Sequence, residues 1–199
     1  MKLTPLAKAL WAAVALAGLG LLALFLSQPA LFSNKDPMYA AIIADFELTN
    51  QHGQVVREDD FAGRWMLIFF GYTNCPDVCP TTIAEMSAVL AGLGENRDKV
   101  QPIMVTIDPA RDTPEVLASY LGFFSPGLVG LTGTAEQIEA TSDSFNIFYA
   151  RTNEPDAPDG YSMSHSSSVY LFDPRGAYIR NYQYGTSAET ILEDLAGRI

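Results

Sequence analysis

Cys75 and Cys79 are the only two cysteines of this 199-residue chain, and they stand four positions apart in the segment GYTNCPDVCP. A thiolate attacks disulfides and coordinates soft metal ions far better than a thiol does. A disulfide between the two is also compatible with the spacing, although so short a loop adds little stability. The pair therefore indicates redox chemistry, metal chemistry or a structural disulfide, and the residues alone do not choose among them.

The elements on either side of the pair explain why the cysteines should be reactive. Upstream, residues 65–70 are a continuous apolar run, which is typical of a strand buried on both faces. Downstream, apolar residues recur at helical spacing at Ile83, Met86, Leu90 and Leu93. Pro80 suits the first position of that helix, where its missing N–H is harmless. The amides and dipole at such a helix N-terminus favour a thiolate.

The remaining patterns predict alternating strands and helices. We expect further strands at residues 45–49, 54–56, 100–107, 127–132, 148–150, 167–172 and 177–182. We expect helices after the N-caps Thr113 and Thr134 and over residues 187–199, with Val116 facing the core. Residues 151–161 are predicted to form a polar loop. This order indicates a layered α/β domain preceded by an N-terminal β-hairpin.

The N-terminal region predicts attachment to a membrane. Residues 9–26 are uncharged, and a run of about 18 apolar residues can cross a bilayer as one helix. Lys2 and Lys8 place residues 1–8 in the cytoplasm. We therefore predict a single transmembrane signal anchor at 9–27, a linker at 28–44 and a domain at 45–199 on the periplasmic side of the inner membrane. The alternative is a cleaved signal peptide.

The charge of the chain limits its partners. There are 12 Lys and Arg residues against 23 Asp and Glu residues, a formal net charge of −11. That balance argues against binding to nucleic acid or to an anionic membrane surface.

Three motifs, in order along the chain, resemble those of the Sco/SenC family. They are GYTNCPDVCP, the segment TIDPARDTP at Thr106–Pro114, and the segment SHSSSVYL at Ser164–Leu171. The resemblance runs from about Phe46 to the C-terminus. It implies a thioredoxin-like fold and a copper chaperone that serves cytochrome c oxidase assembly.

The resemblance also implies three metal ligands: Cys75, Cys79 and His165. In thioredoxin-like folds the loop entering the strand at Val169 faces the cysteines and usually carries a cis-proline. No proline stands there in this chain, and we expect the freed space to let His165 reach the sulfurs. Two thiolates and one imidazole suit Cu(I) or Cu(II), whereas a structural zinc site requires four protein ligands. The other histidine, His52, is expected to be a solvated turn residue.

The function implied is a membrane-anchored chaperone that delivers copper to the binuclear centre of cytochrome c oxidase subunit II or its assembly intermediate. A copper donor and an exported dithiol reductant are further implied partners, because a disulfide leaves no thiolate to bind metal. One alternative is a thiol–disulfide reductase with Cys75 and Cys79 as redox-active residues, and another is a redox or copper sensor. A peroxidase is disfavoured, because Pro76 stands where that chemistry requires Thr. Whether the protein is an enzyme stays open.

Overall fold

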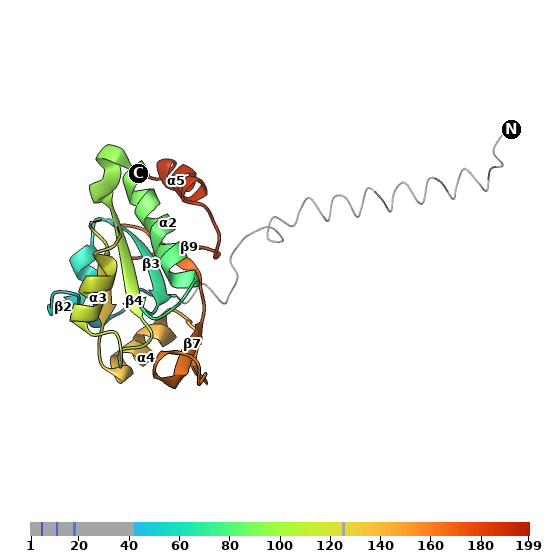
Figure 1. The fold of residues 1–199 in the computed structure, drawn as a ribbon. Coiled ribbons are helices and arrows are strands. Elements are labelled where there is room, and N and C mark those ends of the chain that lie inside the picture. Colours follow the sequence, from blue (N-terminus) through green and yellow to red (C-terminus); the bar gives the residue numbers. More distant parts are fainter. Residues whose placement is uncertain (1–4, 6–10, 12–17, 19–41, 125) are drawn as a thin grey trace. The chain divides into compact units, whose positions relative to one another are not determined.

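The structure, a computed structural model, describes residues 5, 11, 18, 42–124 and 126–199 (Figure 1). Within these residues, none of the helices combines the length and the apolar character that crossing a membrane requires. The predicted anchor at 9–27 lies outside the described residues apart from Trp11 and Gly18. The anchor, the cytoplasmic segment 1–8 and the linker 28–44 therefore stay predictions.

A seven-stranded mixed sheet has the order β2-β1-β5-β4-β3-β8-β9. Its strands are β1 (Glu47–Asn50), β2 (Val55–Arg57), β3 (Trp65–Gly71), β4 (Val100–Thr106), β5 (Val129–Thr132), β8 (Val169–Phe172) and β9 (Tyr178–Tyr182). Strands β3, β4 and β5 are parallel, and the other pairs are antiparallel. The predicted N-terminal hairpin is present as β1 and β2. It belongs to the main sheet, because β1 also pairs with β5.

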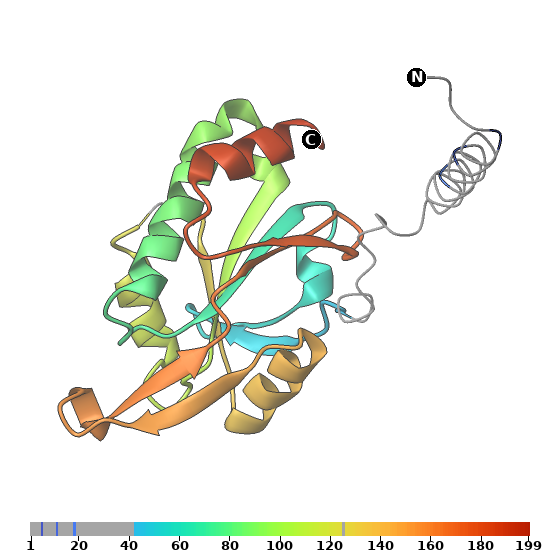
Figure 2. The ribbon, with the colours of Figure 1, turned by 90° about the vertical axis from the view of Figure 1, so that its right-hand side faces the viewer.

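Helices cover both faces of this sheet (Figure 2). The α-helices are α2 (Val78–Gly92), α3 (Pro114–Leu121), α4 (Ala135–Ser144) and α5 (Ala188–Ala196), with short 3-10 helices η2 (Glu58–Phe61), η3 (Gly94–Lys99) and η4 (Pro158–Gly160). Helices α2 and α3 connect neighbouring parallel strands, and right-handed crossovers in one direction place both on one face. Helix α5 packs beside α2, and α4 lies on the opposite face against β1.

The N-caps were predicted well, and one core residue was not. Thr113 and Thr134 accept hydrogen bonds from the backbone N–H groups of Val116 and Gln137, as N-caps do. Val116 is nevertheless 38% exposed, whereas its neighbour Leu117 is fully buried. The helical pattern correctly located the buried face of α3 but wrongly included Val116 in it.

Strand β3 forms the centre of the core. Residues 66–71 are all buried, as expected for a strand between two neighbours and two helical layers. On the α4 side, the ring of Phe145 packs 5.0 Å from Phe70 and 5.4 Å from Phe172, measured between centroids. On the opposite face, β3 lies under α2, whose Ile83 and Met86 are fully buried. This packing fixes the end of β3, from which the cysteine loop departs.

The prediction of a polar loop at residues 151–161 was correct for residues 154–160 and wrong at both ends, which belong to strands. Strands β6 (Tyr149–Asn153) and β7 (Tyr161–His165) pair in an antiparallel two-stranded sheet, with η4 near its tip. We call this element the His165 ribbon; Figure 2 shows it extending away from the main sheet. Strand β6 is mostly exposed and has neither an apolar run nor an alternating pattern. Strand β7 does alternate, with Tyr161 and Met163 separated by serine, but it is only five residues long.

Candidate metal centre

The two cysteines occupy different elements at the end of β3. Cys75 lies in the loop that follows β3 and is half-buried, whereas Cys79 lies inside the first turn of α2 and is fully buried. The loop is closed by a hydrogen bond of 3.3 Å from the N–H of Cys75 to the carbonyl oxygen of Tyr72. Helix α2 begins at Val78 rather than at Pro80 as predicted. Pro80 is still tolerated, since N–H groups of the first turn have no intrahelical partner.

Gly71 gives Cys79 the room it occupies. A Cβ atom built on Gly71 would lie 2.9 Å from the Sγ atom of Cys79 and 2.6 Å from a ring carbon of Phe69. Both distances are too short for non-bonded atoms. The last residue of β3 must therefore lack a side chain for the sulfur to pack against the strand.

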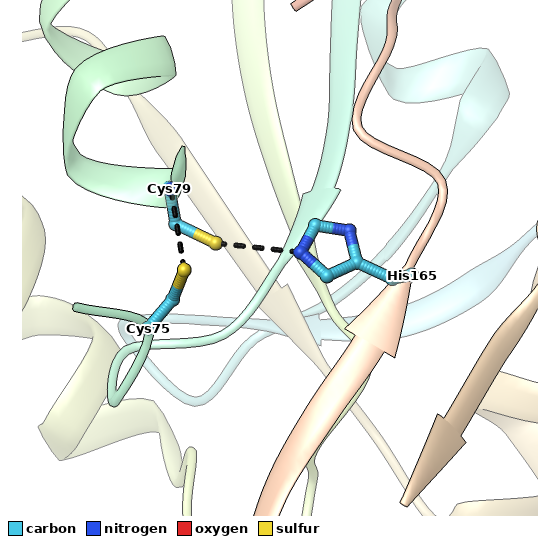
Figure 3. A group of neighbouring side chains, drawn as sticks. All are labelled: Cys75, Cys79 and His165. Atoms are coloured by element: carbon cyan, nitrogen blue, oxygen red, sulfur yellow. Dashed lines mark hydrogen bonds between the residues drawn. The ribbon is translucent and has the colours of Figure 1, made fainter. Parts of the chain in front are cut away.

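His165 reaches the cysteines from the end of β7 (Figure 3). Its Nε2 atom lies 3.6 Å from the Sγ atom of Cys79, and its Nδ1 atom lies 2.8 Å from the carbonyl oxygen of Ser166. That carbonyl only accepts, so we assign the ring proton to Nδ1. The Nε2 lone pair consequently faces the sulfurs, which is the orientation of a metal-binding imidazole.

The three side chains converge on one point. One donor atom each from Cys75, Cys79 and His165 lies within 4.8 Å of the others. The rings of Phe69 and Tyr72 flank the imidazole, each with its centroid 6.0 Å away. These two rings form a largely apolar surface against which the imidazole packs. His52 is exposed in the turn between β1 and β2, as predicted, and takes no part.

The two sulfurs have opposite acid–base properties. The hydrogen bond from the Cys79 side chain, helped by backbone N–H groups, lowers the pKa of Cys75 to about 3 against the effect of burial. The same shared proton, together with burial, raises the pKa of Cys79 far above its ordinary value. At neutral pH the pair therefore holds one thiolate and one thiol.

Asp112 supports the cysteine loop, and sequence reasoning did not single it out. Its side chain accepts hydrogen bonds from the Thr73 N–H at 3.0 Å, the Thr73 hydroxyl at 2.6 Å and the Thr106 hydroxyl at 2.6 Å. The residue is 1% exposed, and this burial raises the pKa of its carboxyl. The only signal for Asp112 in the sequence was its position within the TIDPARDTP motif. Asp112 fixes the loop two residues before Cys75 to the end of β4.

Comparison with known proteins shows the family of this chain. Residues 34–199 match the SCO1/SenC family. The chain belongs to this family. A SCO2-like protein of Rickettsia felis is 42% identical to it over 77% of this chain and 75% of its own length.

Solved Sco structures share the fold. ScoI of Bradyrhizobium japonicum with copper bound is 37% identical, with a TM-score of 0.74, and the match covers 80% of this chain and all of that one. Yeast Sco1 with copper bound is 29% identical, with a TM-score of 0.72, over 79% of this chain and 88% of that one. The predicted thioredoxin-like α/β fold of this Sco-family chain is thereby confirmed.

The donor set selects the kind of ion that fits. Two sulfurs and one imidazole nitrogen are soft to borderline donors, which suit copper(I) in a three-coordinate site. A structural zinc site takes four protein ligands, and within the described residues the group contains three. The centre therefore suits copper better than it suits structural zinc.

Proposed function

We propose that this Sco-family chain binds one copper ion through Cys75, Cys79 and His165 and serves as a copper chaperone in cytochrome c oxidase assembly. The observation that carries the proposal is the convergence of these three donors within 4.8 Å. Copper-bound relatives with the same fold support it. A further relative, BsSco, 27% identical with a TM-score of 0.62, is described as a member of the Sco family of cytochrome c oxidase assembly proteins.

The geometry suggests how copper enters and leaves. Cys75 is half-buried and already a thiolate, so it makes the first contact with an incoming ion. Cys79 then loses its proton and His165 Nε2 completes the site. Release reverses this order by exchange with the ligands of the receiving protein. Each exchange replaces one soft ligand by another, so copper is transferred without becoming a free aqueous ion.

Delivery, partners and location extend the proposal. We infer that the recipient is the binuclear copper centre of cytochrome c oxidase subunit II or its assembly intermediate. A copper donor loads the protein, and an exported dithiol reductant keeps both thiols reduced.

Residues 9–27 anchor the chain in the inner membrane with residues 45–199 in the periplasm, supported by the uncharged run after Lys8. Membrane fractionation and the intact mass of the extracted protein test the anchor; a protein shortened by about 27 residues contradicts it.

A copper(I) competition titration on the reduced full-length chain in detergent tests the metal site. We expect one tightly bound ion in the wild type and none in Cys75→Ser or Cys79→Ser. His165→Ala should weaken binding beyond the about 10–100-fold typical of an outer-shell change. His52→Ala is the matched control and should bind as the wild type does. Binding that is indifferent to His165→Ala would overturn the proposed ligand set.

A thiol–disulfide reductase is the second candidate, favoured by the acid–base state of the pair. A low-pKa thiolate at Cys75 beside a protonated Cys79 is the arrangement of an attacking and a resolving thiol. A disulfide switch is described for BsSco. Reduction of a disulfide substrate by the dithiol, at a rate unchanged by His165→Ala, would favour this function over copper delivery.

A further inference from the structure

The His165 ribbon is not part of the main sheet. Within residues 42–124 and 126–199, β6 and β7 form a backbone ladder only with each other. An isolated two-stranded hairpin is marginally stable in water. Yet the ribbon must hold His165 Nε2 within a few ångströms of two sulfurs that other elements carry. Contacts with the main domain should therefore help to fix its position, besides the short connection from His165 to β8.

Tyr161, the first residue of β7, provides one such attachment. Its side chain is turned inward, and the residue is 6% exposed. Its hydroxyl donates to the carboxylate of Asp108, with distances of 3.0 and 3.2 Å to the two oxygens. Asp108 follows β4 and is itself 4% exposed. A charge-assisted hydrogen bond in a buried setting thus joins the start of β7 to the main domain.

Two arginines enclose the ring of Tyr161. The guanidinium carbons of Arg111 and Arg151 lie 3.7 and 3.6 Å from its centroid. Two guanidinium groups do not fit on one face at that distance, so the ring lies between them. Arg111 also pairs with Asp108, with Nε 2.5 Å from the carboxylate, and donates to the carbonyl oxygen of Tyr161 at 3.4 Å. We call Asp108, Arg111, Tyr161 and Arg151 the Tyr161 clamp.

A second contact lies nearer the metal centre. The N–H of Met163, midway along β7, donates to the hydroxyl of Tyr72 at 3.4 Å. Tyr72 follows the end of β3 and also contacts the imidazole of His165 with its ring. Arg111 lies 5.8 Å from the centroid of that ring. The clamp is therefore continuous with the segment that carries Cys75.

We propose that the Tyr161 clamp is a positioning device that places His165 against Cys75 and Cys79. The proposal rests on the proposed metal-binding function. β7 spans about 13 Å from Tyr161 to His165 at the usual rise of a strand. A strand is stiff over that length, so holding Tyr161 at its start and Met163 at its middle limits where His165 lies at its end. Loss of the clamp should let His165 move away from the sulfurs while the main sheet stays folded.

The test uses three variants of the full-length chain. Tyr161→Leu removes the ring and its hydrogen bond, and Arg151→Ala removes one face of the clamp from an exposed position on β6. Tyr182→Leu is the matched control. Tyr182 is 4% exposed, donates to Asp194 at 2.6 Å and has Arg180 near its ring, but it lies in β9 outside the ribbon.

Amide hydrogen exchange of the reduced, metal-free protein gives a readout that needs no copper. We expect β7 amides to exchange about tenfold faster or more in Tyr161→Leu, and to a smaller degree in Arg151→Ala, with β3 amides unchanged. Tyr182→Leu should leave β7 unchanged. Unchanged exchange in β7 of both clamp variants overturns the proposal whatever the metal data show.

Copper(I) titration then tests the link to His165. We expect Tyr161→Leu to lose about tenfold or more in affinity. If the clamp acts through His165, the double variant Tyr161→Leu/His165→Ala should bind no more weakly than His165→Ala alone. Additive losses would overturn the positioning role. If His165→Ala binds as the wild type does, the proposed ligand set fails, while hydrogen exchange still decides whether the clamp holds the ribbon.

Discussion

The backbone N–H of Cys79 donates a hydrogen bond to the Sγ atom of Cys75, with 3.4 Å between nitrogen and sulfur. The first turn of α2 thus holds one sulfur of the motif as its anion and buries the other. Spacing by three intervening residues produces this difference, because it leaves Cys75 in the loop and places Cys79 inside the helix. The chemistry of the two thiols should differ accordingly.

Alkylation should distinguish the two thiols. Because the pKa of Cys75 is lowered to about 3, its thiolate is fully present from pH 8 down to about pH 4. Reaction with iodoacetamide should therefore be nearly independent of pH over that range, whereas an ordinary cysteine loses reactivity below about pH 8.5. Cys79, buried and protonated, should stay unmodified. Peptide mapping by mass spectrometry checks both, and a Cys75 rate that rises through pH 8 would contradict the assignment.

Metal loading should release about one proton per copper ion near pH 7. The metal-free pair holds one thiolate and one thiol, and coordination by both sulfurs removes the proton that Cys79 retains. Calorimetric titrations in two buffers with different ionisation enthalpies give the number directly. Release of two protons would mean that both cysteines are thiols before loading.

Asp112→Ala should destabilise the fold by about 2–4 kcal/mol, because it leaves the buried hydroxyl of Thr106 and the part-buried N–H and hydroxyl of Thr73 without their acceptor. Asp112→Asn should cost less, since burial raises the pKa of the carboxyl and a neutral side chain avoids that penalty. Asp77→Ala is the control, because Asp77 is exposed and its side chain makes no cap hydrogen bond. Urea unfolding measures all three, and equal stability of Asp112→Ala and Asp77→Ala would refute the role.

Gly71→Ala should perturb the site as well as the fold. The new methyl group would meet Cys79 Sγ at 2.9 Å and Phe69 at 2.6 Å, and overpacking of a filled core costs about 1–3 kcal/mol. Displacement of the sulfur should also weaken copper(I) binding. Gly197→Ala meets no atom closer than 3.7 Å and should be neutral. Wild-type copper affinity in Gly71→Ala would show that the contact is relieved without moving Cys79.

Local patterns predicted much of the main sheet. The run at residues 65–70 became β3, and the Thr113 and Thr134 caps begin α3 and α4 as predicted. These features depend on residues near one another in the chain, so a short window contains the necessary information. The thioredoxin-like fold was confirmed by the arrangement of the strands together with the similarity to solved Sco structures.

The ribbon shows where such reasoning fails. Residues 151–161 were predicted as a loop because they are polar, yet only 154–160 connect the strands, since β6 extends to Asn153 and β7 begins at Tyr161. What orders them includes Tyr161 on Asp108 and Arg111, contacts that join positions 50 or more residues apart. No local pattern in the sequence reports such a contact.

The sequence by itself determined the chemistry available to this protein: two thiols at the junction of a strand and a helix, and a histidine in a family-like segment. Only the tertiary structure decided how they are used. It brings His165 Nε2 to 3.6 Å from Cys79 across 86 positions, and it makes Cys75 the thiolate and Cys79 the thiol. The physical reason is that residue types fix which atoms can donate electrons, whereas pKa values and ligand distances depend on burial and on neighbours that folding alone brings together.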